Sequence, residues 1–274
     1  MHGTDLHAMF DDEFEHDRIK AEAAFGLNEL MAEIDALPSG ARILEIGCGT
    51  GYLLAQLSSR RPDAHFEGVE PIGQGFAKFE ATLSRIEAQF QNLDIHRIPI
   101  EDFVRPQGAA GFDLIFSINV FEHLGDWRMA IDRATALLDT GGRMIILCPN
   151  YAVPYEPHFA IPIIGGPQMT RRLFRKRIAA VEERADSAGL WESLNFISVP
   201  ALESHCKARG IHVVFDRGVM ARMLDRLDTD PEFAKRQSAV AAVARLLRRL
   251  GAGWFLQRVP ARWSPYMKAD LKTA

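Results

Sequence analysis

Short apolar segments alternate with amphipathic ones along the first half of the chain. Apolar side chains recur at helical spacing over residues 11–37, and Pro38-Ser39-Gly40 ends the pattern, which predicts an N-terminal helix. Short apolar runs of the kind that form buried strands follow at 41–47, 65–70, 94–100, 112–120 and 143–148. Helical patterns separate them near 51–60, 74–90 and 126–138. This alternation predicts a parallel sheet with helices on both faces.

After Pro149 the regular alternation stops. Residues 149–170 contain five prolines and several aromatic residues, and they are too apolar for a flexible linker, so we expect a structured insertion. The elements expected beyond it are helices at 171–188 and 196–210, a strand at 210–218, a helix at 231–250 and a last strand at 264–273. The chain is therefore divided into an N-terminal helical segment (1–40), a core (41–150), a lid insertion (151–200) and a C-terminal part of the sheet with a helical insertion (201–274).

The composition is typical of a folded domain. Of the 274 residues, 47% are hydrophobic and 25% are charged, which excludes a disordered, collagen-like or disulfide-stapled chain. The acidic N-terminus predicts no secretory signal, and no run reaches the roughly 18 apolar residues that span a bilayer. Cys48, Cys148 and Cys206 lie too far apart for a metal or disulfide pattern. We expect buried thiols in a cytoplasmic protein, with membrane association as an alternative.

The net charge of −4 hides two basic segments. Residues 171–177 hold five basic residues and residues 235–268 hold eight, and neither segment holds an acid. The first is interpreted as a solvated helix face. The second also carries aliphatic and aromatic side chains, which suits a helix at an anionic membrane surface, although a packed helix or a homodimer contact explains it equally well. No nucleic-acid partner is expected, because the rest of the chain is acidic.

A glycine-rich turn joins the first expected strand to the next helix. Gly47, Gly49 and Gly51 stand at alternate positions, and such a turn lets the backbone approach a ligand while helix N–H groups face it. Dinucleotide-binding turns have the spacing G-x-G-x-x-G instead, and Glu45 would repel a pyrophosphate but attract a cationic group. Glu70 ends the second strand, where an acid can accept both ribose hydroxyls. These features favour a ribose-bearing ligand without a pyrophosphate.

Three stretches, LEIGCGTGYLL, FEGVEP and FDLIFSINVFEHL, together resemble class I S-adenosylmethionine-dependent methyltransferases, most of all the ubiquinone-biosynthesis O-methyltransferases. The resemblance implies a Rossmann-like, doubly wound sheet of seven strands with the last strand antiparallel, and S-adenosylmethionine as cofactor. It assigns the cofactor's amino group to Glu45, its ribose to Glu70 and its adenine to the region of Ile100. The cofactor-binding residues that it implies are Glu45, Gly47, Cys48, Gly49, Gly51, Glu70, Pro71, Ile100, Glu101 and Asn119.

The fourth expected strand ends in the Glu122-His123 pair found in these relatives. Some of them carry a further Glu three residues earlier and hold a divalent cation, but this chain has Asn119 there. Two strong ligands are too few to fix a metal ion, so we expect none. His123 has two interpretations: a base that takes a proton from an acceptor hydroxyl, or a partner of Glu122 in a hydrogen-bonded hinge.

The acceptor should lie near the insertion after the fifth strand, because open α/β sheets bind ligands beyond the carboxyl ends of their strands. Candidate acceptor-binding residues are Tyr151, Tyr155, Glu156 and His158. His158 is the second candidate base. The alternative is that the prolines and aromatic residues of the insertion only pack a connector against the sheet.

The resemblance implies methyl transfer to a small-molecule or lipid- or glycan-linked acceptor, with oxygen as the expected atom. Such a displacement is in line, so alignment and exclusion of water would supply much of the catalysis, with Glu122, His123 and His158 as the candidate catalytic residues. Two alternatives stay open. One is an NAD(P)-dependent oxidoreductase, which the glycine spacing and Glu45 disfavour, and the other is a non-catalytic module that binds S-adenosylmethionine.

Overall fold

The computed structural model describes residues 13–71, 79–105, 107–185, 187–229, 234, 251 and 258–273. The chain forms two compact units. The first unit consists of Met1–Val120, Arg128–Ile145 and Leu271–Ala274, and the second of Phe121–Trp127 and Ile146–Asp270.

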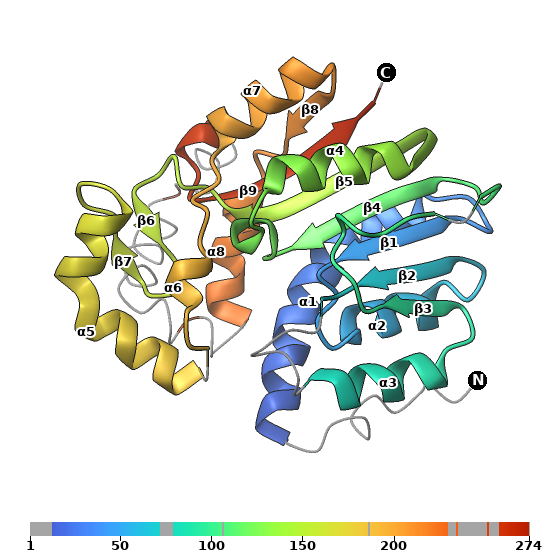
Figure 1. Cartoon of the computed structure of the whole chain (residues 1–274), viewed down its shortest axis with the longest axis horizontal. Helices are drawn as coiled ribbons and strands as arrows, with labels where there is room; N and C mark the ends of the chain where they lie inside the picture. Colours follow the sequence, from blue (N-terminus) through green and yellow to red (C-terminus); the bar gives the residue numbers. More distant parts are fainter. Residues whose placement is uncertain are drawn as a thin grey trace. The chain divides into compact units, whose positions relative to one another are not determined.

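Parallel strands form the centre of the first unit (Figure 1). They are β1 (Arg42–Ile46), β2 (His65–Val69), β3 (Leu93–His96) and β4 (Phe112–Ile118). Ile43 of β1 is paired with Phe66 of β2 on one side and with Leu114 of β4 on the other, and all three side chains are fully buried. Strands that are covered on both faces must be apolar throughout, which is why these segments are continuous apolar runs.

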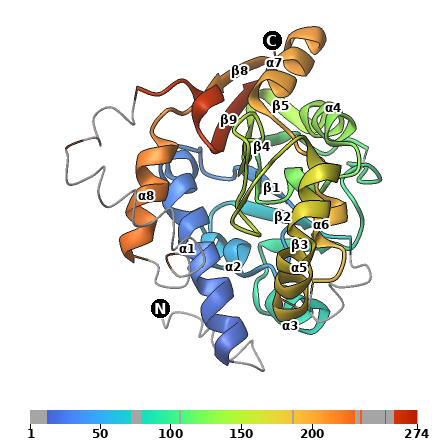
Figure 2. The same cartoon turned by 90° about the vertical axis from the view of Figure 1, so that its left-hand side faces the viewer.

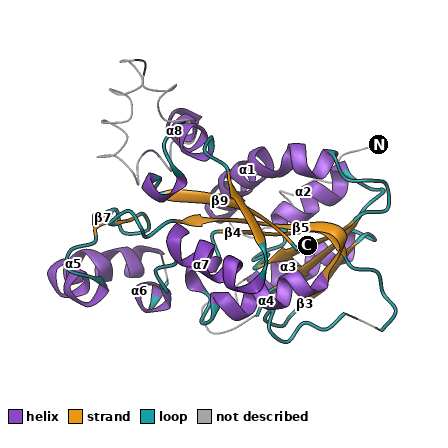
Figure 3. Ribbon diagram, turned by 90° about the horizontal axis from the view of Figure 1, so that it is seen from above, coloured by secondary structure: helices purple, strands orange, loops and turns teal. Residues whose placement is uncertain are grey.

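Helices cover both faces of this part of the sheet. They are α1 (Glu13–Asp35), α2 (Tyr52–Arg60), α3 (Phe79–Gln89) and α4 (Trp127–Leu137). Helix α1 packs along α2, burying Leu30 and Ile34 (Figure 2). Figure 3 shows α1 and α2 on one face of the sheet and α4 on the other. This arrangement is the doubly wound one that the alternating pattern predicts.

Seven strands form one sheet in the order β3-β2-β1-β4-β5-β9-β8. The additional strands are β5 (Leu138–Pro149), β8 (His212–Phe215) and β9 (Tyr266–Lys272). The predicted seven-stranded sheet with its last strand antiparallel is therefore confirmed.

The second unit carries the insertion after β5. It begins with a short antiparallel hairpin of β6 (Tyr155–Glu156) and β7 (Ile161–Pro162). Helices α5 (Pro167–Ala185) and α6 (Leu190–Ser193) follow, and the Trp191 N–H donates to the Glu182 carboxylate (3.0 Å). Further along lie the 3₁₀ turns η2 (Phe121–His123) and η3 (Ala261–Trp263) and the helices α7 (Val199–Arg209) and α8 (Val219–Thr229).

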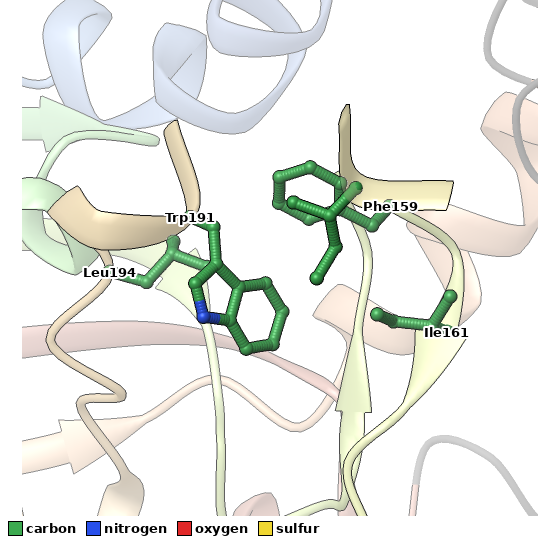
Figure 4. Close-up of a cluster of buried hydrophobic side chains, with 5 residues drawn as sticks. Phe159, Ile161, Trp191 and Leu194 are labelled. Carbon is green, nitrogen blue, oxygen red and sulfur yellow. The ribbon is translucent and has the colours of Figure 1, made fainter. Parts of the chain in front are cut away.

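A separate apolar core joins the hairpin to α5 and α6. Its buried side chains are Phe159, Ile161, Ile178, Trp191 and Leu194, four of which are labelled in Figure 4. The rings of Phe159 and Trp191 pack edge to face, with centroids 5.5 Å apart. The insertion is thus a packed structure, as its apolar composition predicts, and it can hold side chains of the hairpin in fixed positions.

Several elements differ from the sequence-based expectations. The strand predicted at 94–100 ends at His96, because Pro99 has no N–H to continue a ladder. The helix predicted at 171–188 begins at Pro167, since proline suits a first helical turn. Helices α6 and α8 were not predicted. The helix predicted at 231–250 lies outside the described residues, as does most of the basic segment 235–268. Among the described residues, no helix is both long and apolar enough to cross a membrane.

Candidate functional site

The glycine loop, residues 47–51, follows β1 directly and needs glycine at its alternate positions. Gly47, Gly49 and Gly51 have φ values of 75°, 55° and 75°, in the left-handed region that disfavours other residues. At Gly47 there is also no room, since an added Cβ would lie 2.4 Å from Cγ2 of Val120. At Gly49, by contrast, an added Cβ would meet nothing within 4 Å. The open side at Gly49 is where a ligand could approach the loop backbone.

Two buried carboxylates accompany the loop in the first unit. Glu70 accepts a hydrogen bond from the Gly49 N–H to its Oε2 (2.8 Å), which fixes this acid against the loop. Glu45 is buried in β1, and its Oε2 has no hydrogen-bond partner. Burial, and then the nearby charge of Glu70, raise the pKa of Glu45 well above its ordinary value. A buried carboxylate oxygen without a donor fits a ligand that brings its own ammonium group.

The other predicted cofactor-binding residues lie in the same unit. Cys48 is buried, its Sγ would lie 2.7 Å from a Cβ added at Gly68, and burial raises the pKa of its thiol well above the usual value. Ile100 is buried and Glu101 half-buried. Pro71 and Asn119 are exposed, and Asn119 has a left-handed φ of 56°. The structure therefore brings Glu70 directly to the glycine loop, while the adenine-binding roles stay predictions.

In the second unit, a carboxylate and two imidazoles come together from separate segments. Glu122 and His123 belong to η2, and His158 lies in the loop between β6 and β7. The Glu122 Oε1 lies 3.9 Å from Nε2 of His123 and 3.8 Å from Nε2 of His158. We call these three residues the Glu-His-His cluster. Its potential ligand atoms all lie within 4.8 Å of one another, and the carboxylate is fully buried.

Glu156 orients His158 within this cluster. Its Oε1 accepts a hydrogen bond from Nδ1 of His158 (2.6 Å) and another from the Tyr151 hydroxyl (3.1 Å), and its Oε2 accepts one from the Phe159 N–H (2.7 Å). Burial alone would raise the pKa of Glu156, but the hydrogen bonds and the charge of His158 outweigh it and hold the pKa below its usual value. Because Glu156 accepts from Nδ1, that nitrogen of His158 carries a proton, and Nε2 is the ring nitrogen on the side of Glu122.

Ser193 orients the ring of His123 through a hydrogen bond to its Nδ1. The Ser193 hydroxyl donates to the carbonyl of Leu190 (2.8 Å), so its oxygen accepts from Nδ1 of His123 (2.8 Å). This arrangement assigns the Nδ1–H tautomer to His123 as well, with the Nε2 lone pair 3.9 Å from Glu122. The two rings meet edge to face, with centroids 5.2 Å apart.

The electrostatics of the cluster follow from its burial. Burial raises the pKa of Glu122 to about 7, although His158 partly offsets the effect, and neither carboxylate oxygen has a hydrogen-bond partner. Burial, followed by His158, lowers the pKa of His123 to about 4. Cys148 is buried too, and burial together with Glu122 keeps its thiol protonated. The cluster therefore brings a buried carboxylate and two imidazoles together, with ring nitrogens of both imidazoles within 4 Å of the carboxylate, which suits the transfer of a proton.

The predicted acceptor-binding residues separate into two groups. Tyr151, Glu156 and His158 form the hydrogen-bonded set described above, so Glu156 is committed to its neighbours. Tyr155 precedes Glu156 on the same strand and therefore points to the opposite face. Burial, and then Glu156, raise the pKa of Tyr155 to about 12, so its hydroxyl stays protonated.

Sequence reasoning missed two residues that support the cluster. Ser193 lies in the four-residue helix α6. The side-chain amide of Asn195 donates to the carbonyls of Phe121 (2.6 Å) and Leu124 (2.8 Å), and its backbone N–H donates to the carbonyl of Glu122 (2.8 Å). Asn195 therefore fixes the backbone of η2 on three sides. The αL-forming Gly189 before α6 was the available signal for a short helix, but no pattern marks either polar side chain.

Comparisons with known proteins agree with this fold. Residues 14–214 match the family model described as "Methyltransferase domain". The protein Rv1509 of Mycobacterium tuberculosis (strain ATCC 25618 / H37Rv) is 35% identical over 92% of this chain and 85% of its own length. The ubiquinone biosynthesis O-methyltransferase of Rhodopseudomonas palustris (strain BisB5) is 25% identical over 75% of this chain and 72% of its own.

Among solved structures, mycolic acid cyclopropane synthase CmaA1, complexed with SAH and CTAB, superposes with a TM-score of 0.51 and 19% identity. The match covers 97% of this chain and 92% of that one, and it supports the fold. The family match spans both the glycine loop and the Glu-His-His cluster, and it confirms the resemblance drawn from their motifs, together with S-adenosylmethionine as the cofactor. This chain belongs to the methyltransferase-domain family.

Proposed function

We propose that the protein transfers a methyl group from S-adenosylmethionine to a hydroxyl oxygen of a small-molecule or lipid- or glycan-linked acceptor. The observation that carries the choice of oxygen is the Glu-His-His cluster. A hydroxyl is a poor nucleophile until its proton has a place to go, whereas an amine or thiolate at neutral pH needs less help. The Rhodopseudomonas palustris relative is named as a ubiquinone biosynthesis O-methyltransferase, which supports the same choice.

The residues of the first unit fit the cofactor. The open backbone at Gly49 suits its methionine part, the Glu45 carboxylate suits its ammonium, and Glu70 suits its ribose hydroxyls. When bound there, S-adenosylmethionine would supply a methyl group activated by the sulfonium sulfur, which leaves as a neutral thioether when an oxygen nucleophile attacks the methyl carbon in line. The chain's own contribution is to bind and orient, because the glycine loop and Glu70 are already fixed to each other before any ligand arrives.

The second unit contributes the proton acceptor. In the transfer, an oxygen–carbon bond forms, the carbon–sulfur bond breaks with its electron pair, and the hydroxyl proton passes to the Glu-His-His cluster. His158 is oriented for this role through Glu156, in the way that a carboxylate holds a catalytic imidazole in one tautomer. The Tyr151 ring contacts Phe196 and the Phe196 ring contacts Trp191, with centroid distances of 4.9 and 5.7 Å, so the apolar core of the insertion supports the tyrosine that donates to Glu156.

The test uses full-length protein and S-adenosylmethionine labelled in its methyl group. After incubation with a cell extract divided into lipid, glycan and soluble fractions, the label should appear in one fraction as a methyl ether that depends on active protein. Label that appears only on nitrogen or carbon would overturn the oxygen assignment. No transfer, combined with tight cofactor binding, would support the non-catalytic alternative.

Calorimetry distinguishes the methyltransferase from the remaining alternative, an NAD(P)-dependent oxidoreductase. S-adenosylmethionine and its demethylated product should bind to the protein, and NAD should not. Binding of NAD in preference to both would favour an oxidoreductase.

A further inference from the structure

Two arms of the chain carry the Glu-His-His cluster, and one short segment contacts both of them. The first arm is η2, with Glu122 and His123, and the second arm is the loop between β6 and β7, with His158. The arms are distant in sequence, so other residues must set their separation in space. Residues 195–197, which follow α6, contact both arms, and we call them the 195–197 segment.

Asn195 holds the first arm through three hydrogen bonds to its backbone. The side-chain amide donates to the carbonyls of Phe121 (2.6 Å) and Leu124 (2.8 Å), which flank the Glu-His pair, and the backbone N–H donates to the carbonyl of Glu122 (2.8 Å). The ends of a helical turn leave carbonyls without partners in the turn itself, and Asn195 supplies these partners. It thereby fixes the direction in which the side chains of Glu122 and His123 leave the backbone.

The same segment holds the second arm through Tyr151. The Tyr151 N–H donates to the carbonyl of Ile197 (3.0 Å), and the rings of Tyr151 and Phe196 pack together with centroids 4.9 Å apart. The Tyr151 hydroxyl donates to Glu156, which in turn accepts from Nδ1 of His158. A displacement of the 195–197 segment would therefore also displace the residues that orient His158.

The conformation of Phe196 keeps the segment in one shape. Its φ of 56° lies in the left-handed region, which a bulky residue rarely adopts. Oδ1 of Asn195 accepts from the Ile197 N–H (3.0 Å) across this residue, and the Phe196 ring also contacts Trp191, which is labelled in Figure 4. Backbone strain of this kind persists only where the surroundings fix it.

We propose that the 195–197 segment sets the distance between the two arms, with Asn195 as the positioning residue of the Glu-His-His cluster. The inference rests on the proposed function, in which the acceptor's proton passes to this cluster. Glu122 Oε1 lies 3.9 Å from Nε2 of His123 and 3.8 Å from Nε2 of His158, and a misplacement of about 1 Å is enough to slow a reaction strongly. Asn195 acts through Glu122 and His123 and takes no proton itself.

Three variants separate positioning from general stability. Asn195→Ala removes every side-chain contact, whereas Asn195→Asp keeps the acceptor that spans Phe196 and loses the donors to η2. Asn92→Ala is the matched control, because Asn92 is also half-buried and donates to two carbonyls, those of Arg61 (3.4 Å) and Ala64 (3.0 Å), but belongs to the first unit. Each variant should melt a few degrees lower in one cooperative transition and should still bind S-adenosylhomocysteine.

The first readout is the titration of His123, which needs no acceptor. Burial, followed by the charge of His158, lowers the pKa of His123 to about 4, and Glu156 partly offsets the effect. Nitrogen NMR of protein with isotope-labelled histidine rings should therefore show a neutral His123 down to about pH 5, with its proton on Nδ1. The titratable neighbours Glu122, Glu156 and His158 are the same in every variant, and His123→Gln identifies the signal.

Both Asn195 variants should raise the midpoint of this titration by at least about one pH unit, because a loosened η2 lets water reach the ring. Asn92→Ala should keep the wild-type midpoint. An unshifted midpoint in both Asn195 variants, or the same shift in Asn92→Ala, would overturn the proposal. A shift in Asn195→Ala that is absent from Asn195→Asp would assign the effect to the turn at Phe196 and overturn the anchoring of η2.

The second readout is methyl transfer from labelled, saturating S-adenosylmethionine to the fraction of cell extract that contains the acceptor. Asn195→Ala should be slower than the wild-type protein by about 10- to 100-fold, with the dissociation constant for S-adenosylhomocysteine within about twofold. Asn92→Ala should keep the wild-type rate, and an equal rate in all three proteins would overturn the positioning role. A wild-type protein that transfers no methyl group would overturn the proposed function, while the titration of His123 would still decide whether Asn195 positions the cluster.

Discussion

The glycine loop and the Glu-His-His cluster are assembled over very different spans of sequence. The loop's main partner, Glu70, is 21 residues from Gly49, and the loop's dihedrals depend on the glycines themselves. The cluster joins His123 to Ser193 across 70 residues and depends on a hairpin, a short helix and an apolar core. The cofactor loop of the first unit is therefore specified by nearby residues, while the proposed proton acceptor of the second unit depends on tertiary packing.

The largest expected effect comes from the cluster. His158→Gln should lower kcat about 10²- to 10⁴-fold, since it removes the imidazole proposed to accept the hydroxyl proton. The dissociation constant for S-adenosylhomocysteine should stay within about twofold, because the glycine loop does not depend on His158. Steady-state kinetics measures kcat and calorimetry measures the dissociation constant, with His212→Gln, which changes an exposed histidine of β8, as the matched control. A parallel loss of cofactor affinity would show that the two regions are not separable.

The next effect distinguishes two glycines within the loop. Gly49→Ala should cost about 1–2 kcal/mol in free energy of unfolding, from its left-handed φ alone. Gly47→Ala should cost about 2–4 kcal/mol, because its Cβ also collides with Val120. Urea denaturation measures both values.

Val120→Ala provides the control for this pair. In the double variant with Gly47→Ala, it should restore the part of the free energy of unfolding that was lost to the collision with Val120. The part lost to the left-handed φ of residue 47 should remain lost. Equal costs for the two single glycine variants would contradict the close contact with Val120.

A smaller effect is expected on the pH dependence of cofactor affinity, and it comes from the buried carboxyl of Glu45 beside the glycine loop. Burial, and then the charge of Glu70, raise the pKa of Glu45 well above its ordinary value, and a bound ammonium would favour its charged form. Cofactor binding should therefore release a proton below the raised pKa of Glu45 and strengthen as the pH rises toward it, by at most about tenfold per pH unit. Calorimetry in two buffers of different ionisation enthalpy measures the released proton.

Glu45→Gln tests the cause of that pH dependence. The variant should bind the cofactor more weakly and should lose the proton release. A slope that survives in the variant would assign the titration to another group.

The smallest effect lies at the edge of the cluster. Tyr151→Phe removes one hydrogen bond to Glu156, and the net loss should be about 0.5–1.5 kcal/mol of stability with at most a tenfold change in kcat. A double-mutant cycle with Glu156→Gln should return a coupling energy of similar size. A coupling near zero would show that the Tyr151 hydroxyl does not help to hold Glu156.

The same contrast explains how far the sequence could predict the structure. Strands β1, β2, β4 and β5 and the glycine loop follow from contiguous patterns, so they were predictable. Residues Glu122, His123 and His158 could each be named as candidates, but nothing in the chain shows that two Nε2 atoms meet one carboxylate. Ser193 ends a four-residue helix and Asn195 lies two residues beyond it, and so short a stretch has no periodicity.

The long sequence separations in the cluster have a kinetic consequence. Contacts between distant segments must first close long loops, so they tend to form after local ones. We therefore expect a newly made or partly unfolded chain to acquire the glycine loop and its Glu70 contact before His123, His158 and Ser193 come together. Such a chain could hold the methyl donor while having no group to accept a proton from a hydroxyl, so transfer would begin only once folding of the second unit is complete.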